Sequence, residues 1–289
     1  MFENIYNNLI IKKPKSTLSI LIILLLVFGY FSKNFQLDAS SDTLLLENDP
    51  DLKYLREVNR KYGSEDYLVL TYTPEKDLLD PNTIKNLTNL KNDLQNLNWT
   101  NKVITVLDVP LLKNNDDSLS ERIKNFKTLS SEDVNKERGF EEIINSPIYK
   151  NFVISEDGKT SGILVYIKND MKMSKFVLTK NNYLNKINDQ TISAQENKEY
   201  KQFIKEYDSY KKLNNQQNHK NIKEIRNVIK KYQNTAKIHL GGIPMIADDM
   251  MTYVKNDIIV FGAGVFLFII CTLWFVFRSF LWVFIPLLS

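Results

Sequence analysis

Two long runs without a charged residue constrain this chain more than any other feature of its sequence. Residues 16–32 contain no charged side chain, and neither do residues 258–277. A helix needs about 20 apolar residues to cross the ~30 Å hydrocarbon core of a bilayer. The chain as a whole has 43% hydrophobic residues and a mean hydropathy of -0.28, because the long segment between the runs is polar. The sequence therefore predicts a membrane protein with one large water-facing domain, and it excludes a purely soluble enzyme.

The first run is long enough for a short transmembrane helix over residues 17–32. As a helix, the uncharged segment extends about 26 Å, which is close to the thickness of the hydrocarbon core. Three lysines precede the run, and only Lys33 follows it closely. Because cytoplasmic flanks carry an excess of basic residues, we expect a cytoplasmic N-terminus at residues 1–16 and an exported loop at residues 33–257. The three preceding lysines are Lys12, Lys13 and Lys15.

The N-terminal segment leaves two alternatives open. A cleaved signal peptide would show a similar apolar pattern, although the second run already indicates that the protein resides in the membrane. Residues 2–10 carry apolar side chains at helical spacing. This spacing fits a short interfacial helix that leads into the first span, and a frayed terminus fits it equally well.

The second run, residues 258–277, provides about 30 Å of helix. Cys271 lies inside it and is the only cysteine, so no intrachain disulfide is possible, and we interpret it as a packing residue. Residues 278–279 predict a short cytoplasmic turn, and residues 280–289 predict the start of a third transmembrane helix. That last uncharged segment gives only about 16 Å of helix, too short to span. We therefore expect the sequence to be the N-terminal fragment of a longer multi-pass protein.

The loop between the two spans alternates strand and helix patterns. Runs of β-branched and aromatic residues predict strands, and leucine or isoleucine at spacings of three and four predicts amphipathic helices. Polar insertions interrupt the pattern near residues 113–147 and 169–221. Without them the order is β-α-β followed by β-α-β, which predicts an α+β domain of the ferredoxin-like, split βαβ type. The predicted strands are 66–73, 102–109, 152–155, 162–167 and 236–240, and the predicted helices are 50–62, 81–97 and 222–232.

The charge balance of the loop excludes one class of partner. Of 38 basic residues, four lie outside residues 33–257, and of 34 acidic residues only Glu3 does. The loop therefore carries a net charge of only +1. Binding to nucleic acid needs a sustained basic surface, so we expect no nucleic-acid partner.

No pattern in the sequence indicates catalysis or a cofactor. The chain has no phosphate-binding loop, no zinc-protease helix and no nucleophile elbow. His219 lies in a run of Asn, Gln and Lys, so we interpret it as a solvated side chain. His239 precedes a double glycine and lacks nearby partners for a metal. We therefore expect no catalytic residue, no cofactor and no metal.

Two acidic pairs remain as candidates for a role in ion binding or at the membrane. Asp116-Asp117 lacks the glycine and the terminal glutamate of a calcium loop. Asp248, Asp249 and Asp257 lie just before the second span, at the foot of the exported domain. We interpret them as solvated or helix-capping groups, and their position next to the membrane keeps a functional role open.

The end of the exported loop resembles a known membrane junction. The segments LGGIP, ADDMMTYVKNDIIVF and WFVFRSFLWVFIPLL follow one another between Leu240 and Leu288. They resemble the second transmembrane helix and short cytoplasmic turn of resistance-nodulation-division (RND) superfamily transporters, in particular the MMPL, hopanoid-exporter-like branch. The positions that match the family pattern are Gly241, Gly242, Pro244, Asp257, Phe277, Arg278, Ser279 and Pro286.

Two further stretches are similar to the same family. Residues 39–70 resemble the segment after the first helix, and residues 146–168 resemble the hairpin of the family's periplasmic porter domain. The resemblance implies a proton-driven exporter of hydrophobic or amphipathic substrates such as lipids, built from two repeats in the bacterial inner membrane. It also implies a periplasmic loop, contacts with the bilayer and with the rest of the same chain, and room for a homo-oligomer and periplasmic partners. Family members carry their proton-relay acids in a later helix, so we expect none within residues 1–289.

Two other classes of membrane protein have a comparable layout. An ABC-type permease with a large periplasmic domain after its first helix would need a separate ATPase. A two-span ligand sensor would continue past Arg278 into a soluble domain, whereas this sequence continues into FLWVFIPLL. The second arrangement is therefore disfavoured, and the permease remains the main alternative to an RND-type exporter.

Overall fold

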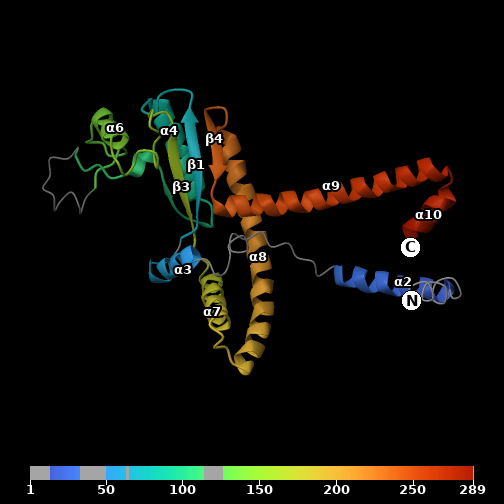
Figure 1. Cartoon of the computed structure of the whole chain (residues 1–289). Coiled ribbons are helices and arrows are strands. Elements are labelled where there is room, and N and C mark those ends of the chain that lie inside the picture. Colours follow the sequence, from blue (N-terminus) through green and yellow to red (C-terminus); the bar gives the residue numbers. More distant parts are fainter. Residues whose placement is uncertain (1–13, 33–49, 63–64, 114–125, 289) are drawn as a thin grey trace. The chain divides into compact units, whose positions relative to one another are not determined.

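The computed structural model describes residues 14–32, 50–62, 65–113 and 126–288. These residues form two compact units, one from residues 45–249 and the other from residues 1–44 together with residues 250–289. The structure is largely helical, with one small antiparallel sheet and two helices long and apolar enough to cross a membrane (Figure 1). The expected interfacial helix at residues 2–10 and the acidic pair Asp116-Asp117 lie outside the described residues.

The unit of residues 45–249 is built on a four-stranded sheet in the order β2-β3-β1-β4. Every neighbouring pair is antiparallel, with Leu70 of β1 opposite Ile163 of β3 and Leu240 of β4. Along β1, Leu68, Leu70 and Tyr72 are fully buried, whereas Thr71 is exposed. One face of the sheet is therefore covered, as alternation along a strand requires. The strands are β1 (Tyr67–Pro74), β2 (Thr100–Ile104), β3 (Ser161–Ile167) and β4 (Ala236–Gly241).

Two amphipathic helices cover the buried face of the sheet. Helix α4 (Pro81–Gln95) connects β1 to β2, and α8 (Ala194–Tyr232) precedes β4. Asp80 caps α4 by accepting hydrogen bonds from the amides of Asn82 and Thr83, and a proline follows at the first helical position. The apolar stripes of both helices join the strands in one core, which includes Leu87, Leu90, Leu94, Ile222, Ile225 and Ile229. Truncating one of these side chains to alanine costs about 2–5 kcal/mol in a typical core.

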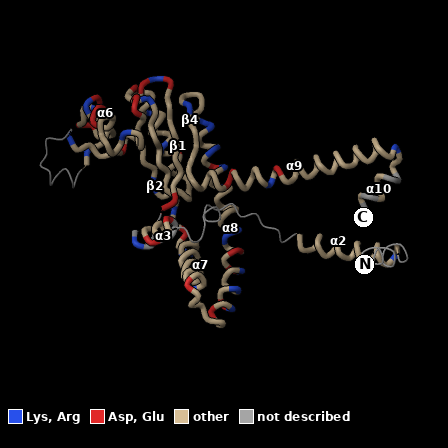
Figure 2. The backbone as a smooth tube through the Cα atoms, in the orientation of Figure 1, with Lys and Arg blue, Asp and Glu red and all other residues tan. Residues whose placement is uncertain are grey.

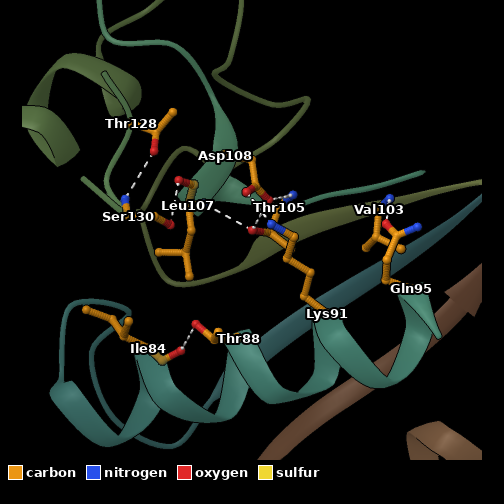
Figure 3. A network of polar contacts seen from close by, with 10 residues as sticks. All are labelled: Ile84, Thr88, Lys91, Gln95, Val103, Thr105, Leu107, Asp108, Thr128 and Ser130. Atoms are coloured by element: carbon orange, nitrogen blue, oxygen red, sulfur yellow. Dashed lines mark hydrogen bonds and ion pairs between the residues drawn. The ribbon is translucent and has the colours of Figure 1, made fainter. Parts of the chain in front are cut away.

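Beyond Ile104 the predicted strand 102–109 is wrong, because a hydrogen-bonded turn ends β2. The amide of Leu107 donates to Thr105 Oγ1, and Asp108 Oδ2 accepts from the Thr105 amide. These bonds cap the short 3-10 helix η3 (Val106–Asp108). Figure 3 shows Lys91 of α4 reaching the same aspartate, so the turn is fixed to the helix that covers the sheet.

The predicted strand 152–155 is also wrong. Asn151 has φ 63°, in the left-handed region, and Ile154 forms only isolated bridges with Lys150 and Ser161. The segment is therefore a set of turns beside β3. The Asp-Gly turn that follows is present, with Gly158 at φ 68°.

The stretch 169–221, predicted as partly helical and exposed, contains a helical hairpin. Helix α7 (Met171–Asn188) is followed by the 39 residues of α8, of which the predicted helix 222–232 is only the end. Ser193 and Glu196 form a capping box at the start of α8. The two helices meet through aromatic rings with centroids 5.4–6.3 Å apart, namely Phe176, Tyr183, Tyr200, Phe203, Tyr207 and Tyr210.

Two smaller helices complete the described part of this unit. Helix α3 (Pro50–Tyr62) precedes β1, and α6 (Lys136–Ile144) lies within the region 113–147 that was predicted to be a mainly helical insertion. Asn135 caps α6 by accepting a hydrogen bond from the amide of Arg138. Glu142 of α6 accepts from the backbone amides of Leu112 and Lys113, and thereby holds that loop against the helix.

The candidate membrane spans are α2 (Pro14–Ser32) and α9 (Ile243–Phe277). Charged side chains are frequent on the sheet-bearing unit and absent from α2 after Lys15 and from the outer part of α9 (Figure 2). Helix α9 is 35 residues long and begins 15 residues before the predicted span at residue 258. Helix α10 (Phe280–Leu288) follows after a two-residue break.

Candidate junction site between the sheet and the second membrane helix

The candidate site is the point where β4 passes into α9. Gly241 ends β4 opposite Val69 of β1, and α9 begins two residues later. Gly242 has φ 115°, a conformation that side chains rarely adopt. A Cβ atom at this position would lie 3.0 Å from the carbonyl oxygen of Tyr67 and 3.1 Å from Cα of Leu68. The turn into α9 therefore requires glycine for two reasons, its backbone angle and its close approach to β1.

The first turns of α9 are tied to α8 by a buried acid. Asp248 is only 8% exposed, and its two carboxylate oxygens lie 2.9 and 3.0 Å from Nδ1 of His219. Because the carboxylate can only accept, this geometry assigns the proton on the histidine to Nδ1. An acid in such a position without a partner would be strongly destabilising. His219 therefore provides the hydrogen-bond partner that the buried carboxylate of Asp248 needs.

Two further contacts join the same helices. Arg226 Nη2 donates to both carboxylate oxygens of Asp249, at 2.9 and 2.7 Å. Asn218 Nδ2 donates to the backbone carbonyl of Pro244 at 2.9 Å. We call these contacts the α8–α9 clamp; its members are Asn218, His219 and Arg226 on α8 and Pro244, Asp248 and Asp249 on α9.

The C-terminal part of α8 is also fixed to neighbouring elements of the sheet-bearing unit. Trp99 Nε1 donates to Glu224 at 2.9 Å, and the hydroxyl of Tyr232 donates to Asp93 of α4 at 3.1 Å. Burial and the neighbouring carboxylate of Asp93 raise the pKa of Tyr232 to about 12. Lys231 pairs with the same aspartate. Helix α8 is thus held by α4 at its end and holds α9 in turn.

The structure corrects the interpretation of the charged residues at this site. His219 was predicted to be solvated and is instead a partner of a buried acid. Asp248 and Asp249 were predicted to be solvated or capping groups and are instead paired with α8. Arg226 and Asn218 were not singled out from the sequence. His219 and Arg226 lie seven residues apart and continue the helical spacing of the buried stripe, and that spacing is the signal that could have revealed them.

The remaining motif positions lie along the two C-terminal helices. Asp257 is exposed on α9, and Phe277 is the last residue of that helix. Arg278 has φ 48°, and its amide donates to the carbonyl of Trp274 at 2.8 Å, which closes the end of α9. Ser279 lies in the break, and Pro286 lies within α10. The structure therefore groups Gly241, Gly242 and Pro244 with the clamp, and distributes the other five positions along α9 and α10.

The described residues offer no alternative chemistry at the junction. Among them, no group of three or more His, Cys, Asp or Glu side chains is arranged to hold a metal ion. His239 is exposed on β4 and borders an open hollow of about 600 Å³, together with Thr73 and Lys237.

Comparison with known proteins finds one family that resembles the C-terminal part of the chain. The model of the MMPL family matches residues 209–289, which include the second half of α8, β4, the clamp, α9 and α10. No curated protein gives a match. Members of the MMPL family are membrane transporters. The match agrees with the resemblance to the RND/MMPL superfamily seen in the sequence, and it covers residues 209–289.

Proposed function

We propose that this protein is a proton-driven exporter of hydrophobic or amphipathic molecules, including lipids, in the bacterial inner membrane. The family match and the two apolar helices support this proposal. The excess of lysine before α2 supports a cytoplasmic N-terminus and a periplasmic location for residues 33–257. No finding favours the permease or the sensor.

In this proposal the unit around the sheet is a ferredoxin-like porter domain. The strand order β2-β3-β1-β4 supports this assignment, because it is the order of two interlocked βαβ units. Helix α4 joins β1 to β2, and the segment that contains α8 joins β3 to β4. The hairpin of α7 and α8 is then an addition to the second crossover.

The observation that carries the proposal is the continuity of α9. One uninterrupted helix starts at the sheet, passes through the clamp and continues into the apolar run at residues 258–277. A transporter of this class needs its membrane helices to move the domain that handles substrate, and a shift of α9 cannot leave α8 in place while the clamp holds. We therefore assign to the clamp the transmission of movement from the membrane helix to the domain. Substrate would be handled by apolar and aromatic side chains of the domain and by its floor at residues 241–257.

The test is transport by the intact protein in vesicles with an imposed proton gradient. Wild-type protein should expel a lipophilic fluorescent dye in a gradient-dependent manner. The double variant Arg226→Ala/Asp248→Ala should lose about tenfold in rate, which lies within the usual range of coupling between sites. His239→Ala, on exposed β4, serves as the matched control and should retain the rate.

The outcomes separate the two parts of the proposal. If wild-type efflux ignores the gradient, the proton-driven function is wrong. If the double variant keeps wild-type efflux, the clamp does not transmit the movement. Circular dichroism of each variant shows whether a loss of rate reflects loss of the fold.

A further inference from the structure

Helix α8 carries a row of exposed lysines along the side that faces away from the core. At about 100° per residue, six lysines fall within about 60° of the helix circumference. All six are exposed, and the row is about 48 Å long at about 1.5 Å per residue. Basic residues at intervals along α8 are visible in Figure 2. We call this the α8 lysine row; its members are Lys198, Lys201, Lys205, Lys212, Lys223 and Lys230.

Acidic residues on the same side of the helix do not balance this row. Asp208 is the only acidic residue of α8 within about 90° of the midline of the row. In the part of the chain that the structure describes, no ammonium group of the row is paired with a carboxylate, whereas Arg226 and Lys231 of the same helix are paired. The positive potentials of neighbouring lysines therefore add along α8, and such a surface attracts an anionic partner.

The net charge of the whole loop conceals the charge of this helix. Helix α8 has ten basic and five acidic residues, a net charge of +5. The rest of residues 33–257 has 24 basic and 28 acidic residues, a net charge of -4. The near-neutral balance of the loop therefore does not describe the surface of α8.

The side of α8 opposite the lysine row is already buried. Tyr207, Ile222 and Ile225 are at most 4% exposed. A helix that lies in a membrane surface inserts apolar side chains into the lipid, and the apolar side of α8 is used within the domain. The positions between the lysines are polar, such as Ser209 and Gln216, and lysine is depleted in the cores of protein interfaces. These features favour a partner that is contacted through charge along an extended line.

We infer that the α8 lysine row binds an extended anionic polymer of the cell envelope, with carboxylate or phosphate groups along its chain. Each ammonium group contacts an oxyanion of the polymer, and release of the counterions of the polymer favours binding. The length of the row favours a polymer over a small anion, which would contact only one or two of the lysines. The inference rests on the proposed periplasmic location of residues 33–257, and it depends neither on the transported substrate nor on proton coupling.

The test measures the binding of two labelled polyanions to the intact protein in detergent. Fluorescein-labelled polygalacturonate presents carboxylates, fluorescein-labelled polyphosphate presents phosphates, and fluorescence anisotropy gives a Kd for each. The variant Lys198→Gln/Lys205→Gln/Lys212→Gln, called the row variant, neutralises three members of the row with little change in helix propensity. Circular dichroism of each variant shows whether its fold is retained.

Lys85→Gln/Lys136→Gln/Lys159→Gln is the matched control, because it removes three exposed lysines outside α8 and gives the same net charge. The row variant should bind about tenfold more weakly than wild type at about 50 mM NaCl, whereas the control should stay within about twofold. Between about 50 and 200 mM NaCl, six contacts give a slope of about -4 for log K against log [NaCl], and three contacts give about -2. The polymer that binds more tightly identifies the preferred oxyanion.

Four results would overturn the inference. Equal weakening in both triple variants would show that overall charge, and not the row, determines binding. Absence of binding to both polymers at about 50 mM NaCl would remove the proposed partner. Binding to vesicles that contain phosphatidylglycerol, without binding to either polymer, would show that the row meets a lipid surface. A dimer in light scattering that dissociates in the row variant would show that the row meets a second copy of the chain. Transport is not measured, so failure of the proposed exporter function and failure of this binding are separate results.

Discussion

Gly241 and Gly242 are neighbours in sequence, but they differ in backbone angle and in the space available for a side chain. Gly242 has φ 115°, and a Cβ atom there would approach β1 to within 3.0 Å. At Gly241 the nearest atom to such a Cβ is the carbonyl oxygen of Val69 at 3.7 Å, an ordinary contact. Only the second glycine is therefore required for the chain to leave the sheet and begin α9.

We predict that Gly242→Ala destabilises the junction by about 1–3 kcal/mol, the usual cost of a strained backbone angle. Gly241→Ala is the matched control and should change the free energy of unfolding by less than about 0.5 kcal/mol. Urea titration of both variants in detergent, followed by circular dichroism, measures the difference. Equal midpoints for the two variants would show that the turn can relax without cost.

The sequence identified part of this residue-level picture. The glycines, Pro244 and the two aspartates could be singled out because they precede the apolar run. Their partners on α8 could not be paired with them, because His219 and Asp248 are 29 positions apart and His219 looks solvated among polar neighbours. Which acid is buried depends on how two helices pack, and periodicity within either helix does not encode that choice.

At the scale of elements, the polar composition of helix α8 concealed its full length. Its first half is rich in Asn, Lys and Gln, so only the isoleucine stripe near its end predicted a helix. The pattern Ser193-x-x-Glu196 is a capping box and marks the true start of the helix. The apolar run in α9 likewise predicted only the apolar part of a longer helix. Asp248, Asp249 and Asp257 lower the mean hydropathy of the residues before that run, so the helical start was not recognised.

We predict that the start of α8 is stable to acid well below the ordinary range of a glutamate. Hydrogen bonds from Lys186 and from the backbone amide and side chain of Ser193 lower the pKa of Glu196 to about 2. A lowered folded-state pKa means that the contribution is present above about pH 4.5 and is lost as pH falls through about 2. Amide hydrogen exchange near residues 193–200 should therefore stay slow in wild type down to about pH 3.

Glu196→Gln is the variant for this prediction. It keeps the shape and removes the charge, so exchange should be faster than in wild type above pH 4.5 and should no longer depend on this titration. Glu199→Gln, on the exposed surface of the same helix, is the matched control. If Glu196→Gln and wild type exchange alike across this range, the capping box does not hold the helix start.

At the scale of the whole molecule, the two candidate spans differ from the rest of the chain in having no acidic, basic or histidine side chain in their apolar parts. Residues 17–31 and 258–277 contain no Asp, Glu, His, Lys or Arg. A proton responds to the transmembrane potential only on groups held inside the membrane. Asp257 is exposed on α9 just before the apolar run. In the proposed exporter, we therefore expect the proton-carrying groups to lie outside these two segments.

We predict that residues 33–257 face the periplasm and that Arg278 faces the cytoplasm. The physical reason is the excess of lysine before α2. In a Cys271→Ala background, Lys159→Cys in the Asp-Gly turn should react with a membrane-impermeant maleimide in cells whose outer membrane has been permeabilised. Arg278→Cys is the control for the opposite side and should react only after lysis of the inner membrane. The reverse pattern would invert the topology.

The length of α8 has a consequence for the scale of movement. Its buried contacts with the sheet-bearing core begin at Asn221, so residues 194–220 extend about 40 Å beyond the point where α8 joins that core. A rigid helix of that length moves most at its far end when it tilts about the clamp beside α9. A tilt of about 5° displaces that end by about 3.5 Å, roughly the width of one atom layer. If the clamp transmits movement as we propose, a change at α9 too small to disturb the sheet would thus be amplified where the aromatic rings of α7 and α8 meet, and it would be large enough to open or close a contact.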